Sequence, residues 1–363
     1  MKSINFKKVA VSSLIVLVLT LSLISLSVEA AEYEMKISHY TITDPEISGI
    51  AASLLYFENM VETRTYGDVE VEVYGNSTLG GVKDVTRETV KGNTVQSSIA
   101  YGGVFASFFE KYQLMYSPYL FPNYRSAWAF MDSEFFADFM EEARKETGLR
   151  HLGIYDDGGG FVAFTNNKRL IKTPEDIKGL RIRVEGGNAA QQAMIEGLGA
   201  KAVPLPWGDV TTALASGVAD GQFNAPYVNG FAKFWEVNDY TSWTKFIFNT
   251  AVWSVSDKWF KTLPKEYQNV ILTTADEAID IARGINVQQS VLDWEEGKKH
   301  YKDTYMPTPK VQKQWEEKLR PVFYEWVTED FGIKKEVVDE FWEKADSVSK
   351  EVDGKITSNY GTN

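Results

Sequence analysis

Two arginines stand one residue apart in the segment GLRIRVEGG, residues 179–187. The pattern predicts a buried strand with Arg181 and Arg183 on one face and the apolar residues between them on the other. Arginine is seldom buried without a partner. Arg183 lies nearer the carboxyl end, where its guanidinium could bind a ligand carboxylate through two parallel hydrogen bonds. We expect Arg181 to be a paired surface charge. For Arg183, an internal salt bridge with Asp209 or Glu185 is an equal alternative.

Two aspartates precede three glycines in RHLGIYDDGGGFVAFTNN, residues 150–167. The pattern predicts a strand, a glycine turn and a second strand. Gly158–Gly160 suit either a crossing of the chain between two lobes or a plain tight turn. Turn preference favours Asp156 and Asp157 as solvated residues. Asp157 is also a candidate ligand contact, in which case an amino group on the ligand would be implied.

The elements that would position these side chains alternate between strands and helices. Segments 34–38 and 69–74 predict strands around a helix that ends at Gly67, and a second helix ends near Gly92. Further along, Thr173, with Pro174 and Asp176, predicts a capped helix start. Strands and helices then continue to alternate, which predicts parallel sheets. Ligands collect at the carboxyl ends of such strands, so Tyr101, at the end of SSIAYGG, is a further candidate.

The predicted fold class is α/β, with two lobes, a hinge between them and a long bridging helix. We expect lobe I to comprise residues 31–158 and about 250–285, and lobe II residues 159–249 and about 286–310. The chain would cross between the lobes near Gly158–Gly160 and again near Asn249–Trp253. Residues 311–363 predict amphipathic helices packed across both lobes, with Trp315, Trp326 and Trp342 in the core.

The composition bounds the class of protein. The 363 residues are 44% hydrophobic, enough for a large core, and carry a net charge of −12, which disfavours nucleic-acid binding. Basic residues, an uncharged run over 9–28 and small residues at its end predict a signal peptide over 1–30, with an uncleaved membrane anchor as the alternative. Cysteine is absent, which excludes disulfides, thiol catalysis and lipoprotein attachment. A free periplasmic location fits best.

No catalytic set stands out. His39, His151 and His300 are scattered, and neither GxSxG nor HExxH occurs. We therefore expect no enzyme activity, no cofactor and no metal. A hydrolase based only on carboxylates stays open as an alternative, because the 50 acidic residues offer many pairs.

The segments TPEDIKGLRIRV (173–184) and GLGAKAVPLPWGDVTTALASGVADGQFNAP (197–226) carry a resemblance to a known family. They resemble the substrate-binding proteins of tripartite ATP-independent periplasmic (TRAP) transporters, of the dicarboxylate-binding-protein-like type. GDVEVEVYGNSTLGG and YSPYLFPNY extend the likeness over most of the chain. The resemblance implies a two-lobed protein that closes on a small organic acid and delivers it to a small and a large integral membrane subunit. We expect a monomer. A ligand-binding sensor module of the same fold is the alternative.

The resemblance also implies a role for three residues. Arg183 would hold the ligand carboxylate, Trp207 would stack on the ligand, and Asn224 would donate a side-chain hydrogen bond; core packing for Trp207 and a turn role for Asn224 remain alternatives. Many family members have an arginine where this chain has Val162. With a single guanidinium, a ligand with one carboxylate is favoured. Val162 and Tyr101 would then line the rest of the pocket.

Overall fold

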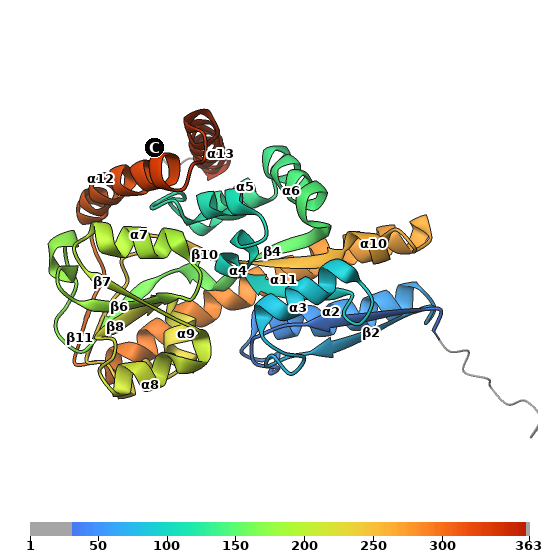
Figure 1. Cartoon of the computed structure of the whole chain (residues 1–363), viewed down its shortest axis with the longest axis horizontal. Helices are drawn as coiled ribbons and strands as arrows, with labels where there is room; N and C mark the ends of the chain where they lie inside the picture. Colours follow the sequence, from blue (N-terminus) through green and yellow to red (C-terminus); the bar gives the residue numbers. More distant parts are fainter. Residues whose placement is uncertain (1–30, 361–363) are drawn as a thin grey trace, which may run out of the picture.

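The structure is a computed structural model that describes residues 31–360, so the predicted signal peptide of residues 1–30 lies outside the described residues. Two β-sheets lie side by side with helices packed on their faces (Figure 1). The two-lobed α/β fold is therefore confirmed. No helix between residues 31 and 360 is long and apolar enough to cross a membrane.

The first sheet has five strands in the order β2-β1-β3-β10-β4. Strands β1, β2 and β3 are parallel, whereas β10 is antiparallel to both of its neighbours. The elements of this half are β1 (Tyr33–Ser38), α2 (Gly49–Arg64), β2 (Val69–Tyr74), α3 (Val82–Lys91), β3 (Ser97–Tyr101), α4 (Gly102–Ala106), η1 (Glu110–Tyr116), α5 (Tyr124–Met131), α6 (Glu134–Thr147), β4 (Leu149–Phe161), β10 (Phe248–Ser256) and α10 (Asp257–Phe260).

The second sheet has six strands in the order β11-β9-β5-β8-β6-β7. Strand β6 is parallel to β7 and β8, but β5 is antiparallel to β8 and β9. The elements here are β5 (Ala163–Asn166), η2 (Pro174–Ile177), β6 (Arg181–Glu185), α7 (Ala189–Gly197), β7 (Lys201–Leu205), η3 (Trp207–Asp209), α8 (Val210–Ala215), β8 (Gly221–Asn224), α9 (Pro226–Phe231), η4 (Phe234–Glu236), β9 (Tyr240–Ser242) and β11 (Asp303–Tyr305). The prediction of purely parallel sheets was wrong. Each of β5 and β10 begins where the chain has crossed from one sheet to the other, and each is antiparallel to its neighbours.

The glycines 158–160 lie inside β4, and the prediction of a tight turn there was wrong. Their φ angles are +58°, +93° and +67°, values that glycine adopts far more readily than other residues. The chain leaves the first sheet at Phe161 and enters the second at Ala163, so the glycines precede a crossing. The chain returns to the first sheet between β9 and β10. Strand β10 begins at Phe248, so this second crossing lies just before residues 249–253, where it was predicted.

One long helix, α11 (Lys265–His300), runs along both halves of the molecule (Figure 1). It packs on α2 and β4 of the first half and on α9 of the second. The C-terminal helices α12 (Pro309–Glu325) and α13 (Lys335–Tyr360) are joined by η5 (Trp326–Asp330). Helix α12 packs on α7 and α13 packs on α5, so they contact both halves. Trp315 is fully buried, whereas Trp326 and Trp342 are only partly buried against the same core.

Gly159→Ala is expected to destabilise the protein by about 2 kcal/mol or more. A Cβ atom at this position would lie 2.0 Å from Oγ of Ser290 on α11, and the φ of +93° is unfavourable for alanine. The measurement is the denaturant midpoint of unfolding. Gly67→Ala is the matched control, because Gly67 has a φ of +87° but no neighbour near its added Cβ. Equal losses in the two variants would contradict the role of crowding.

Candidate functional site

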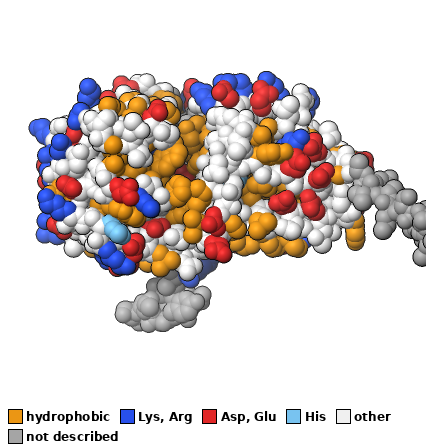
Figure 2. Space-filling model, turned by 90° about the horizontal axis from the view of Figure 1, so that it is seen from below, with side chains coloured by type: hydrophobic (Ala, Val, Ile, Leu, Met, Phe, Trp, Pro, Cys, Tyr) orange, Lys and Arg blue, Asp and Glu red, His pale blue; other side chains and the backbone are white. Residues whose placement is uncertain are grey.

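A cavity of about 660 Å³, here called the crevice, opens between the two sheets. Loops after β1 and β2 and the carboxyl ends of β3, β6 and β8 contribute to its wall, as expected for ligand sites of open α/β sheets. Figure 2 shows hydrophobic side chains gathered along the middle of the face seen from below, with charged side chains around them. The polar and aromatic side chains that line the crevice include Tyr40, Tyr101, Asp157, Arg183, Glu185, Trp207, Asn224, Tyr227 and Phe231.

Arg183 lines the crevice and is only 4% exposed. Its Nε and Nη2 atoms donate to the carbonyl of Leu205, at 3.1 and 2.9 Å. Within residues 31–360 it has no ion pair closer than 4 Å, so neither Asp209 nor Glu185 forms the salt bridge considered above. Nη1 likewise makes no hydrogen bond there. Arg181, by contrast, pairs with Asp220 at 2.7 Å, as predicted for a satisfied surface charge.

Glu185 lies two residues beyond Arg183 on the same face of β6 and also lines the crevice. Its Oε2 accepts hydrogen bonds from Asn188 at 2.9 Å and from the hydroxyl of Tyr116 at 3.3 Å. Burial lowers the pKa of Arg183, and the charges of Glu185 and of Tyr101 oppose this shift. Glu185 thus partly balances the buried guanidinium without pairing with it directly.

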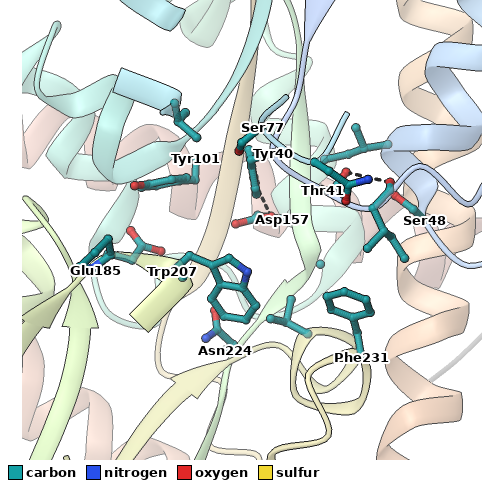
Figure 3. Close-up of a pocket in the computed structure, with 18 of the residues that line it drawn as sticks. Tyr40, Thr41, Ser48, Ser77, Tyr101, Asp157, Glu185, Trp207, Asn224 and Phe231 are labelled. Carbon is teal, nitrogen blue, oxygen red and sulfur yellow. Dashed lines mark hydrogen bonds between the residues drawn. The ribbon is translucent and has the colours of Figure 1, made fainter. Parts of the chain in front are cut away.

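The two aspartates of β4 face opposite ways. Asp156 is fully buried and accepts a hydrogen bond from Asn286 of α11 at 3.0 Å. Asp157 faces the crevice and accepts one from the hydroxyl of Tyr40 at 2.6 Å (Figure 3). Burial raises the pKa of Asp157 to about 7; the Tyr40 hydrogen bond opposes this shift and the charge of Glu185 adds to it. The interpretation as turn residues was wrong, because β4 continues through both positions, and only Asp157 is partly exposed.

Aromatic side chains from both halves line the crevice that Asp157 faces. Tyr40 and Tyr101 meet edge to face with ring centroids 5.5 Å apart. Trp207 begins η3 directly after β7, is 36% exposed and points into the space opposite them (Figure 3). Tyr227 and Phe231 of α9 complete the set. The crevice can therefore enclose a small molecule between apolar faces while leaving a few polar groups to orient it.

Asn224 ends β8 and lines the crevice, where its Nδ2 donates to Oε1 of Gln222 at 2.6 Å. One of its two amide hydrogens is thus already used. Val162 does not line the crevice, and that expectation was wrong. It is fully buried at the crossing into β5, where its carbonyl accepts from Lys245 and its side chain joins the hydrophobic core.

Several residues that line the crevice were not predicted from the sequence. Tyr40 follows β1 just as Tyr101 ends β3, so the rule that identified Tyr101 could have identified it too. Tyr227 and Phe231 lie on a short helix whose position depends on packing against α11, and no motif marks them. Within the described part of the chain, no group of three or more histidine or acidic side chains is placed to hold a metal ion.

The family model for bacterial extracellular solute-binding proteins, family 7, matches residues 37–330. This chain belongs to that family. The match covers both sheets, the long helix α11 and α12. The sequence resemblance to TRAP substrate-binding proteins is thereby confirmed, and the family is one of binding proteins rather than enzymes.

Individual relatives of this chain have low sequence identity to it, but the alignments cover most of both chains. It is 28% identical to the C4-dicarboxylate-binding periplasmic protein of Vibrio cholerae, over 81% of this chain and 86% of that one. It is 27% identical to the 2,3-diketo-L-gulonate-binding periplasmic protein of Escherichia coli, over 65% and 71%. A TRAP periplasmic solute-binding protein from Ochrobactrum anthropi superposes with a TM-score of 0.78 at 26% identity, over 91% and 99% of the two chains. Such relatives are named periplasmic.

Proposed function

We propose that this protein captures a small organic acid in the periplasm and delivers it to the small and large membrane subunits of a TRAP transporter, without catalysing a reaction. The observation that carries the proposal is the guanidinium of Arg183, which is almost fully buried, lines the crevice and has no acidic partner within 4 Å among residues 31–360. A carboxylate is the partner that satisfies its remaining donor geometry. Family membership agrees with this assignment.

The ligand contacts follow from the same geometry. Arg183 binds the carboxylate, Trp207 covers the body of the ligand, and Asn224 donates its second amide hydrogen. Because Arg183 is the one buried cation found in the crevice of residues 31–360, the ligand carries a single carboxylate. The relatives named above bind acids of both kinds, since 2,3-diketo-L-gulonate has one carboxylate and a C4-dicarboxylate has two.

The test begins with the purified protein. Denaturation followed by mass spectrometry should release a small acid that was retained in the crevice, and adding that acid back should compact the molecule in small-angle X-ray scattering. Uptake by vesicles that contain the two membrane subunits should then require the protein. An acid that binds without driving uptake would leave the sensor-module alternative in place and contradict delivery.

Trp207→Ala is expected to weaken binding of the retained acid by about 5-fold to 30-fold, because stacking and contact area of an aromatic side chain contribute about 1–2 kcal/mol. Trp207→Phe should recover part of the loss. Isothermal titration calorimetry measures both. The control is Trp235→Ala, since Trp235 stacks on His300 away from the crevice. A greater loss for the phenylalanine variant than for alanine would remove the stacking role.

A further inference from the structure

The charges in the crevice do not balance for a simple acid. Within residues 31–360, the crevice is lined by one buried cation, Arg183, and by two buried or half-buried carboxylates, Asp157 and Glu185; Lys83 and Asp84 also line it but are exposed. Glu185 already accepts from Asn188 and Tyr116, whereas within residues 31–360 the Asp157 carboxylate accepts from the Tyr40 hydroxyl alone. Once a ligand carboxylate has neutralised Arg183, Asp157 is left with one donor and most of its acceptor capacity unused. We therefore expect a group of the ligand to interact with the Asp157 carboxylate.

The surroundings of Asp157 suit a positive charge. Tyr40 and Tyr101 lie on one side of the open space, and Trp207 lies on the other (Figure 3). Tyr227 and Phe231 add two more rings from α9. Ring faces attract cations, and the effect grows when the cation is removed from water. A carboxylate among aromatic rings is thus complementary to a nitrogen cation.

We propose that the ligand is a small zwitterion, an amino acid or an N-alkylated derivative of one, whose carboxylate pairs with Arg183 and whose positively charged nitrogen lies against Asp157. This inference rests on the proposed function, because it assumes that the crevice binds an organic acid. It makes Asp157 the residue that separates amino acids from the corresponding hydroxy and keto acids.

The competing arrangement is a protonated Asp157 that donates to a hydroxyl or keto oxygen, and pH distinguishes the two. The titratable groups that interact electrostatically with Asp157 are Tyr40, Tyr101, Tyr116, Asp156, Glu185 and Tyr227. Burial raises the pKa of Asp157 to about 7 in the free protein. A cationic ligand needs the ionised form, so its affinity should increase as pH rises from 6 to 8. The affinity for an oxygen ligand should decrease over the same range.

The experiment compares matched probes by thermal shift and calorimetry. Four ammonium compounds (leucine, phenylalanine, proline and glycine betaine) are paired with 2-hydroxy-4-methylpentanoate, 3-phenyllactate, tetrahydrofuran-2-carboxylate and 3,3-dimethylbutanoate. Any compound that copurifies with the protein joins the panel. We expect at least one ammonium compound to bind, and to bind at least about 30-fold more tightly than its matched acid, which keeps the carboxylate but has no cationic nitrogen.

The variant Asp157→Asn should remove this preference, because it keeps the shape and the Tyr40 contact but loses the charge. Asp138→Asn is the control, since it makes the same charge change on the exposed side of α6. The inference is overturned if no ammonium compound binds, if the matched acid without the cationic nitrogen binds equally well, or if Asp157→Asn keeps the preference. Binding of the acids without a cationic nitrogen alone would overturn it and leave the proposed function standing. Binding by no probe and no copurified acid would overturn both.

Discussion

Arg183→Ala is expected to weaken binding of the organic acid by about 30-fold to more than 1000-fold. Removing one partner of a buried charge pair costs roughly 2–5 kcal/mol, because the other charge is left without compensation. Arg183 fits this case, since it is 4% exposed and its fixed contacts go to one backbone carbonyl. Calorimetric titration with the retained acid measures the loss.

Arg181→Ala is the matched control for Arg183→Ala. The two arginines share a strand and a face, but Arg181 is bound to Asp220 through Nε and Nη2, at 3.1 and 2.7 Å. We expect its loss to change affinity less than about 3-fold, because Arg181 does not line the crevice and its charge is already paired with Asp220. Arg183→Lys should give an intermediate result, because lysine keeps the charge and loses the parallel hydrogen bonds. Similar effects at 181 and 183 would show that the assignment of Arg183 to the ligand is incorrect.

Local patterns predicted those parts of the site that follow directly from strand geometry. The alternation of β6 separated the arginines from Ile182 and Val184, which are buried in the core. The rule that ligands collect at carboxyl ends of strands placed Tyr101 in the crevice. Trp207 and Asn224 came from the family resemblance and also line it.

The remaining parts depend on contacts that no local pattern encodes. Turn preference misassigned Asp157, because three glycines with positive φ angles lie inside β4, where α9, α11 and β10 each pack close against one of them. Val162 was placed in the pocket from the family's arginine position, yet at the crossing its side chain turns into the core. Glu185 was considered only as a partner of Arg183, and its place in the crevice depends on contacts with η1 and α7.

A dicarboxylate is expected to bind at least about 100-fold more weakly than the monoamide of the same acid, for example glutarate compared with glutaramate or succinate compared with succinamate. The first carboxylate of either ligand can pair with Arg183. The second would face Asp157 and Glu185 or lose its hydration without a partner, which costs about 3 kcal/mol or more. The amide has nearly the same shape and no charge, so the comparison isolates the electrostatic cost. Competition against the retained acid, followed by calorimetry, measures the ratio.

Lys83 is a second cation in the crevice, and its substitution tests whether it pairs with the second carboxylate of a dicarboxylate. It lines the crevice, but unlike Arg183 it is exposed, and water screens its charge. A dicarboxylate that bound as tightly as its monoamide, and that lost affinity in Lys83→Gln, would show that Lys83 supplies the second cation and would contradict the preference for one carboxylate. If instead the ratio of about 100 is found and Lys83→Gln leaves it unchanged, Arg183 is the cation that pairs with the ligand carboxylate and Lys83 does not supply a second one.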